Sequence, residues 1–102
     1  MNYQIRFDKK FTREYRKIDR SLQIEGDKKL KRLKEDPENI GKPLKYFTNL
    51  YELHLQSFRI YYIVDKVDFL VFVLTIRHKN EQDKFLRNIK IEDIKKIIEE
   101  NS

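Results

Sequence analysis

Cysteine is absent from the 102-residue chain. This absence excludes a disulfide framework, a thiolate nucleophile and any zinc site built on cysteine, and it fits a reducing compartment. The longest apolar run, FLVFVLTI, has eight residues, whereas a membrane-spanning helix needs about 20. The N-terminal stretch MNYQIRFDKK has no apolar core of the kind found in signal peptides. We therefore expect a cytoplasmic protein.

Several motifs of catalytic chemistry are missing as well. The chain contains no glycine-rich phosphate loop and no Gly-x-Ser-x-Gly elbow. Its two histidines, His54 and His78, do not show the HxxxH or HxH spacing that is typical of a metal site. We therefore expect neither a bound metal ion nor another cofactor.

Basic residues outnumber acidic ones. The 23 Lys and Arg residues against 17 Asp and Glu residues give a net charge of +6 and an isoelectric point near 9.5. Such an excess favours polyanionic partners, namely nucleic acid, an anionic membrane surface or an acidic protein. A charge-rich surface that only keeps a small protein in solution is the alternative explanation. The length fits a single domain, residues 1–102.

Hydrophobic periodicity divides the chain into strands and helices. Tyr3 to Phe7 alternates apolar and polar residues, as a half-buried strand does. Two helical stripes follow, the first capped by Asp8 and the second stopped by Pro37. The remaining predictions are a loop over 37–49, a hairpin over 50–64, a buried central strand at FLVFVLTI, a short helical piece over 81–87 and a final amphipathic helix marked by Ile91, Ile94, Ile97 and Ile98. The order predicts an α+β fold with an N-terminal strand, a two-helix hairpin, a three-stranded antiparallel meander and a C-terminal helix.

The stretch LYELHLQSFRIYYIV predicts two strands that fold back at Gln56-Ser57. Pairing across this two-residue turn places His54 opposite Arg59 and Glu52 opposite Tyr61. Leucine, phenylalanine and isoleucine then share one face of the hairpin, as a core face requires. The other face carries a carboxylate, an imidazole, a guanidinium and a phenol.

The buried strand that follows is predicted to pair with the hairpin through a tight turn. In that register Asp65 lies opposite Asp68, and Arg59 lies opposite Leu74. His78 then shares the face of Arg59. A slip of one residue would move His78 to the opposite face of the sheet.

The predicted polar face is suited to cleaving RNA without a metal ion. A ribose 2′-hydroxyl must lose a proton as it attacks the adjacent phosphate, and the 5′-oxygen must gain one as it leaves. Imidazoles titrate near neutrality and serve either step, while cationic side chains stabilise charge on the pentavalent phosphorane. Glu52 would act as the base or orient His54, and Tyr61 would stack on an unstacked base. The candidates are Glu52, His54, Arg59 and His78 for catalysis, with Lys45, Arg77, Lys79 and Tyr61 for binding.

Each candidate also has a purely structural interpretation. His54 and Arg59 fit a solvated cross-strand pair, and Glu52 then only neutralises the arginine. His78 fits a surface histidine at the end of a strand. The abundant tyrosines and phenylalanines fit a core better than a base-stacking platform. From the residues alone, nuclease activity is one of several functions.

Four segments together resemble one protein family across nearly the whole chain. They are YQIRFDKKFTREYRKI, GKPLKYFTNLYELHL, SFRIYYIV and the strand that ends in LTIRHK. Their order and spacing are similar to those of the RelE/ParE superfamily of toxins from type II toxin–antitoxin systems. This resemblance implies a microbial-RNase-like α+β fold with a basic concave face that holds mRNA. It also implies an antitoxin partner that wraps the toxin with an amphipathic helix.

In the RelE branch, the toxin cuts mRNA in the ribosomal A site, leaves a 2′,3′-cyclic phosphate and uses no metal. The resemblance therefore implies that mRNA and the ribosome are partners. Arg59 matches the arginine that those toxins use on the scissile phosphate, and Lys45 and Lys79 match basic residues of the preceding loop and the C-terminal segment. His78 sits where some branches place a catalytic histidine. Phe85 falls near a functional tyrosine, where it would stack on a base.

Glu52 and His54 depart from the family pattern, because the best-studied RelE has lysines there. The superfamily also includes ParE-type members, which lack the nuclease residues and poison DNA gyrase. His54, Arg59 and His78 favour the nuclease branch. A noncatalytic antitoxin-binding module is the third interpretation.

The predicted C-terminal helix is a candidate for displacement by the antitoxin. Its apolar stripe, marked by Ile91, Ile94 and Ile98, is short and follows two weak turns. We expect this helix to pack reversibly near the active face and to be displaced by the antitoxin.

Overall fold

Five strands form one sheet in the computed structural model, which describes residues 2–45 and 47–101. Their order across the sheet is β1-β5-β4-β3-β2. Their bounds are β1 (Gln4–Phe7), β2 (Lys42–Pro43), β3 (Leu50–Leu55), β4 (Phe58–Asp65) and β5 (Leu70–His78). β1 runs parallel to β5, and the other neighbouring pairs are antiparallel. The predicted meander β3-β4-β5 and the α+β class are therefore confirmed.

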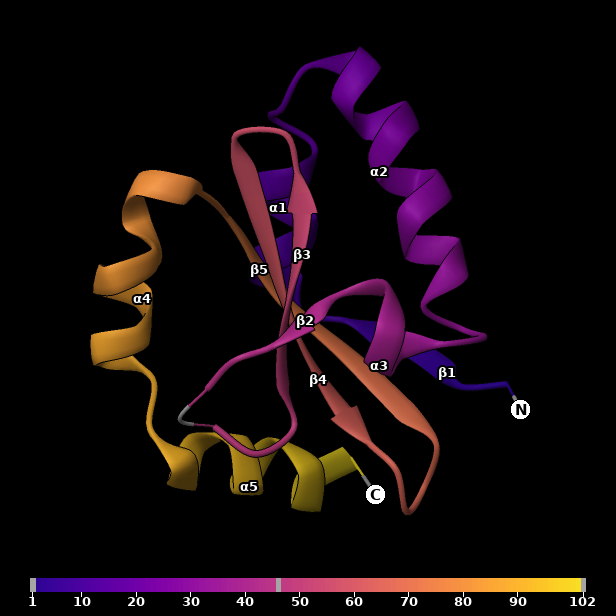
Figure 1. Ribbon diagram of the computed structural model, residues 1–102, viewed down its shortest axis with the longest axis vertical. Coiled ribbons are helices and arrows are strands. Elements are labelled where there is room, and N and C mark those ends of the chain that lie inside the picture. Colours follow the sequence, from indigo (N-terminus) through magenta and orange to yellow (C-terminus); the bar gives the residue numbers. More distant parts are fainter. Residues whose placement is uncertain (1, 46, 102) are drawn as a thin grey trace.

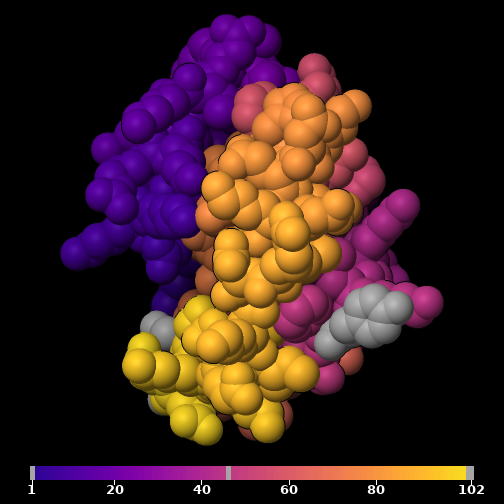
Figure 2. Space-filling model, turned by 90° about the vertical axis from the view of Figure 1, so that its left-hand side faces the viewer, coloured from indigo at the N-terminus to yellow at the C-terminus, as the bar shows by residue number. Residues whose placement is uncertain are grey.

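Helices cover both faces of the sheet (Figure 1). On one face lie α1 (Lys9–Tyr15) and α2 (Arg20–Arg32), which form the predicted helical hairpin. On the other face lie α4 (Gln82–Asn88) and α5 (Ile91–Asn101), seen as the orange and yellow surface in Figure 2. Two further short pieces are α3 (Pro37–Ile40) and the 3-10 turn η1 (Lys79–Glu81). Within the described ranges, no helix is both long and apolar enough to cross a membrane.

Two apolar cores hold these layers together, one on each face of the sheet. On the first face, Phe11 of α1 and Leu30 and Leu33 of the α2 end pack against strand residues such as Leu53 and Ile60. The second core consists of Leu50, Tyr61, Ile63, Leu70, Phe72, Phe85 and Ile94. Because successive residues of a strand point to opposite faces, β4 and β5 contribute to both cores. The predicted central strand, β5, does lie inside the sheet, between β1 and β4.

The segment 37–49, predicted as a loop, contains α3 and β2. Proline is favoured in the first turn of a helix because its fixed φ suits the helix and its missing N–H is not needed there. Pro37 occupies that position in α3. β2 then pairs with β3 through Lys42 and Glu52. Gly41 allows this close approach, because a Cβ there would lie only 2.7 Å from the carbonyl oxygen of Glu52.

The predicted register of the β3–β4 hairpin is confirmed. His54 pairs with Arg59, and Glu52 pairs with Tyr61. Gln56, the first residue of the two-residue turn, has a φ of 54°, which a tight hairpin of this length requires at that position. The local pattern of the strands was sufficient to set this pairing.

The predicted register between β4 and β5 is wrong. Asp65 pairs with Leu70 and not with Asp68, which shifts the register by two residues. A bulge between Tyr61 and Tyr62 shifts it by one further residue. The total shift of three residues is odd, so side chains change face.

The shift exchanges the expected neighbours of the polar face. Arg59 pairs with Arg77 and not with Leu74, while Phe58 pairs with His78. His78 therefore lies on the face of Phe58, and Arg77 takes the place expected for His78. The longer turn and the bulge are the physical reasons.

Candidate functional site

Polar side chains from four elements meet on the sheet face that α4 partly covers. They are Glu52 and His54 of β3, Arg59 of β4, Arg77 of β5 and Gln82 at the start of α4. Cross-strand pairing gathers them, because Arg59 lies between His54 on one neighbouring strand and Arg77 on the other. The face thus combines a carboxylate, an imidazole and two guanidinium groups.

The carboxylate of Glu52 holds the imidazole of His54. Its Oε1 lies 2.8 Å from Nε2 of His54, and its Oε2 accepts a hydrogen bond from the side-chain amide of Gln82. The side chain of Glu52 is 7% exposed, whereas that of His54 is 43% exposed. The pair therefore presents an imidazole to solvent and keeps its carboxylate buried beneath.

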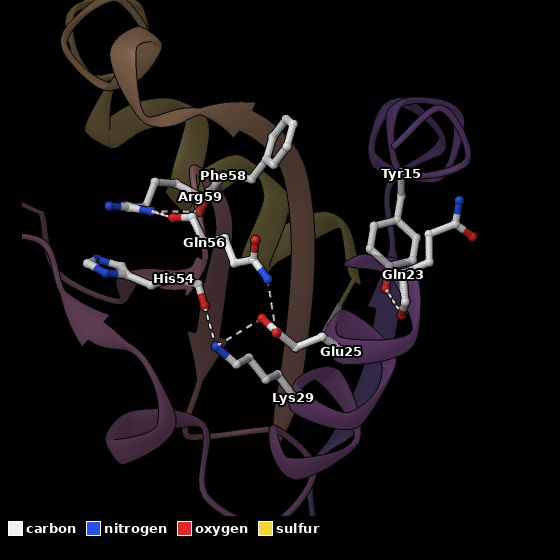
Figure 3. A network of polar contacts seen from close by, with 8 residues as sticks. All are labelled: Tyr15, Gln23, Glu25, Lys29, His54, Gln56, Phe58 and Arg59. Carbon is white, nitrogen blue, oxygen red and sulfur yellow. Dashed lines mark hydrogen bonds and ion pairs between the residues drawn. The ribbon is translucent and has the colours of Figure 1, made fainter. Parts of the chain in front are cut away.

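Arg59 projects beside His54 (Figure 3). Its Nη1 donates hydrogen bonds to the carbonyl oxygens of Gln56 and Phe58, at 2.7 and 2.8 Å. Both acceptors belong to the backbone around the β3–β4 turn, so these bonds fix the guanidinium in position. A guanidinium has five N–H donors in a planar fork, and within the described residues only those on Nη1 of Arg59 make hydrogen bonds.

Arg77 supplies the second guanidinium of the site. Its Cζ lies 5.4 Å from the centre of the Phe85 ring, and its Nη1 lies 3.8 Å from the carboxylate of Glu81. Its Nε is buried and has no hydrogen-bond partner within the described part of the chain. A buried donor without a partner costs free energy. The Arg77 side chain is 20% exposed, so an anion would meet the exposed part of the guanidinium and not Nε.

Tyr61 and Phe85 do not offer stacking surfaces in this structure. Tyr61 is fully buried, and Phe85 is 8% exposed. The two rings stack on each other with their centroids 4.2 Å apart. This corrects the expectation that either ring stacks on an RNA base, because α4 places Phe85 over Tyr61 and closes the aromatic face.

The hydroxyl of Tyr61 lies close to the carboxylate of Glu52. Burial, and then the negative charge of Glu52, raise the pKa of Tyr61 to about 12. The hydroxyl has no hydrogen-bond partner among the described residues. Tyr61 therefore stays protonated at neutral pH and is not a proton acceptor there.

His78 lies apart from His54, on the opposite face of the sheet. Its ring packs edge-on against Phe58, with the centroids 5.8 Å apart. Its Nδ1 accepts a hydrogen bond of 3.2 Å from the backbone N–H of Asn80 and so caps η1. The structure does not bring the two histidines together.

The two predicted phosphate-binding lysines are exposed. Lys79 begins η1, and its backbone N–H donates to the carbonyl oxygen of Ser57 at 2.7 Å. Since Ser57 belongs to the turn that Arg59 binds, Lys79 lies at the rim of the site. Lys45 lies in the segment between β2 and β3.

A groove beside His54 is lined by three cations that the sequence did not single out as site residues: Lys29, Arg32 and Lys42. We call it the basic groove. Nζ of Lys29 donates to the carbonyl oxygen of His54 at 2.8 Å and lies 3.8 Å from Glu25 (Figure 3). In the sequence, Lys29 and Arg32 resemble any solvated positions of a basic helix, and no local pattern shows which strand the helix lies beside.

Comparison with known proteins gives a family match over most of the chain. A family model described as the ParE toxin of the type II toxin–antitoxin system parDE matches residues 5–83. A RelE-like toxin protein of Escherichia coli is 25% identical over 87 residues, which cover 83% of this chain and 92% of that relative.

Solved structures show the same fold. A mutant of the E. coli toxin RelE in the free state has a TM-score of 0.70 and is 26% identical, covering 83% of this chain and 92% of that one. A chain of the intact E. coli RelBE toxin–antitoxin complex has a TM-score of 0.68 and 27% identity, over 74% of this chain and 95% of that one. The toxin–antitoxin complex RelBE2 of Mycobacterium tuberculosis, at 21% identity and a TM-score of 0.67, covers 76% of this chain and 99% of that one.

Proposed function

Since the chain belongs to the RelE/ParE superfamily of toxins from type II toxin–antitoxin systems, we propose that it is an endoribonuclease of the RelE type. Its substrate is mRNA on the ribosome, and its reaction is attack of a 2′-hydroxyl that leaves a 2′,3′-cyclic phosphate without a metal ion. The observation that carries this proposal is the strand pairing that places His54, Arg59 and Arg77 on one face above Glu52.

The two arginines support a role in binding the scissile phosphate. Arg59 is fixed by the turn carbonyls, and Arg77 lies opposite it on β5 with a side chain that is partly exposed. Preorganised cationic donors stabilise the charge that develops on the phosphorane more than the charge of the ground state, and they act best where water is partly excluded.

The lysines around this centre support binding of the RNA backbone. The basic groove brings Lys29, Arg32 and Lys42 next to His54, and Lys45 and Lys79 add exposed positive charge. Cations that neutralise successive phosphates supply most of the sequence-independent affinity for nucleic acid. The catalytic role of His78 stays a prediction, and we leave it out of the proposed step because it lies on the other face.

A cognate antitoxin is the partner that we propose for the toxin at rest. Two of the solved structures that share this fold are toxin–antitoxin complexes. A toxin that acts on ribosomes would work in the cytoplasm, which agrees with the location expected from the sequence.

Inhibition of DNA gyrase is the second candidate function. It is favoured by one specific observation, namely that the matching family model is described as a ParE toxin. His54 and Arg59 on one polar face favour the nuclease, because a gyrase poison has no need of an imidazole beside a guanidinium.

The substitution Arg59→Ala tests the proposed function with purified ribosomes and an mRNA substrate. We expect cleavage by the wild-type protein and a rate about 10²–10³-fold lower for Arg59→Ala, the typical loss of one preorganised donor to a transition state. Primer extension would locate and quantify the cuts.

The matched control is Arg13→Ala, which removes the same charge from an exposed position of α1. Its rate should stay close to that of the wild type. If the wild-type protein cuts no mRNA but blocks supercoiling by gyrase, the nuclease assignment is wrong and the ParE-type function replaces it.

A further inference from the structure

On the polar face, Glu52 is buried, whereas His54, Arg59 and Arg77 are partly or fully exposed. Its two carboxylate oxygens serve two different donors, Nε2 of His54 on Oε1 and the amide of Gln82 on Oε2. The hydroxyl of Tyr61 adds a third polar neighbour. With 7% of its side chain exposed, Glu52 has little surface left for an RNA hydroxyl.

We propose that Glu52 is a positioning residue that holds His54 with its proton on Nε2, so that Nδ1 of His54 is the atom that takes the proton from the RNA 2′-hydroxyl. This inference rests on the proposed endoribonuclease function. It assigns the general base to one nitrogen atom and gives Glu52 and Gln82 supporting roles.

The proton on Nε2 follows from hydrogen-bond chemistry. When the carboxylate of Glu52 is ionised, it only accepts hydrogen bonds, and the ring nitrogen 2.8 Å from its Oε1 is then the one that carries the hydrogen. In a neutral imidazole one nitrogen is a donor and the other an acceptor. Glu52 therefore leaves the lone pair on Nδ1.

Nδ1 of His54 is open to a substrate. No hydrogen bond to this nitrogen occurs within the described residues, and the His54 side chain is 43% exposed. The ring lies next to Arg59 (Figure 3) and lines the edge of the basic groove. A phosphate bound by these cations would bring the adjacent 2′-hydroxyl to the open side of the imidazole.

The other candidate bases are less suited to this step. Nδ1 of His78 already accepts the N–H of Asn80, and the ring lies on the opposite face. Tyr61 is protonated at neutral pH, as a tyrosine with the ordinary pKa of 10.0 would be, and burial raises its pKa further, to about 12. Glu52 itself is held on both oxygens. His54 is the one ring among these groups that is both oriented and open.

In the proposed step, His54 accepts one proton and solvent water supplies the other. The 2′-hydroxyl gives its proton to Nδ1 of His54, and its oxygen forms a bond to phosphorus. The bond between phosphorus and the 5′-oxygen breaks, and the leaving oxygen takes a proton from solvent water. The imidazolium then returns its proton to solvent, while the carboxylate of Glu52 stabilises its positive charge.

Gln82 couples this pair to α4. As the first residue of α4, Gln82 reaches Glu52 on β3 across 30 positions of sequence. The amide fixes the carboxylate plane, which in turn fixes the ring of His54. This is the arrangement by which an outer carboxylate selects a tautomer of an active-site histidine.

The tautomer is tested by nitrogen-15 NMR of the imidazoles in the full-length protein without RNA. The chain has two histidines, so His54→Gln and His78→Gln each remove one set of signals and assign the spectrum. We expect His54 of the neutral wild-type protein to carry hydrogen on Nε2 and none on Nδ1. A hydrogen on Nδ1 in the wild-type protein would overturn the proposal without the need for any variant.

Two substitutions then test the role of Glu52. In Glu52→Leu, and to a lesser degree in Gln82→Leu, His54 should become a mixture of tautomers, while the His78 signals stay in place as the internal control. Gln82→Leu keeps the buried carboxylate, so it remains informative if Glu52→Leu does not fold. A His54 spectrum that is unchanged in the folded variants would overturn the role of Glu52.

The cleavage assay with ribosomes separates this inference from the proposed function. His54→Gln should lower the rate about 10²–10⁴-fold, the usual contribution of a general base. Glu52→Leu should lower the rate of the wild type but cause no further loss in the His54→Gln background, because it acts through the imidazole. If the double variant loses the product of the two single losses in rate, Glu52 acts independently of His54, and the proposed positioning role is wrong. If the wild-type protein does not cleave mRNA but His54 has the expected tautomer, the endoribonuclease function is wrong, while the positioning of His54 by Glu52 is retained.

Discussion

At the level of single residues, two adjacent buried tyrosines differ in whether their hydroxyl groups make a hydrogen bond. Tyr61 and Tyr62 are both fully buried on β4, but they belong to different cores. The hydroxyl of Tyr62 donates to the carbonyl oxygen of Pro37 at 2.6 Å. The hydroxyl of Tyr61 has no such partner in the described part of the chain. The same functional group is therefore satisfied on one face and unsatisfied on the other.

This contrast predicts unequal effects of the same substitution. Tyr62→Phe should lower the free energy of unfolding by about 1–3 kcal/mol, because it leaves the buried carbonyl of Pro37 without its donor. Tyr61→Phe should lower it less, because the Tyr61 hydroxyl makes no hydrogen bond of ordinary geometry in the described part of the chain and has only the side chains of Glu52 and Gln82 as polar neighbours. Urea unfolding followed by circular dichroism measures both, and equal losses would contradict the assignment.

At the scale of elements, α5 is attached less firmly than the strands. Ile94 is its one buried residue among those described, with Ile97 and Ile98 partly buried against the second core. Ile91 is 51% exposed. A helix of 11 residues has little stability of its own in water and depends on the apolar surface that it buries. Such a helix opens more readily than the buried strands.

Hydrogen exchange tests whether the antitoxin displaces this helix. On binding of the cognate antitoxin, amides of residues 89–100 should exchange faster, while those of β4 stay slow because both faces of that strand are covered. Mass spectrometry of the free and bound toxin would give the comparison. Slow exchange over 89–100 in both states would rule out displacement.

At the scale of the whole molecule, burial acts on the tyrosines together. Five of them have a pKa above the ordinary value of 10.0, and burial is the largest cause in each: Tyr3, Tyr15, Tyr51, Tyr61 and Tyr62. The folded protein therefore keeps protons that the unfolded chain releases above pH 10. Folding and tyrosine ionisation are linked.

The linkage predicts loss of stability in alkali. A raised folded-state pKa contributes stability that is fully present below the unfolded value of 10.0 and is lost as pH rises through the folded value, about 12 for Tyr61. Urea unfolding at stepped pH should show the free energy of unfolding falling above pH 10. Tyrosine absorbance should show ionisation together with unfolding. The fall should be shallower in Tyr62→Phe, and a flat profile would contradict the linkage.

The hairpin at the centre of the site, and every α-helix and strand except α3 and β2, could be predicted from the sequence. Alternation of apolar and polar residues on both sides of Gln56 leaves one register in which a core face forms, so Glu52, His54 and Arg59 were placed correctly. This pairing is local, and a two-residue turn fixes it. The helical hairpin and the final helix follow from periodicity in the same way.

The side chains that complete the site come together only through long-range packing. The partner of Arg59 on β5 depends on the four-residue connection between β4 and β5 and on a bulge beside Tyr61. No sequence pattern predicts either feature. The same holds for Lys29, which reaches β3 from α2, and for Gln82, which reaches Glu52 from α4. These contacts result from packing helices onto both faces of the sheet, which sums many weak apolar contacts between distant segments. The pattern of a single strand carries no information about these contacts, so it cannot predict which residues of other elements lie beside it.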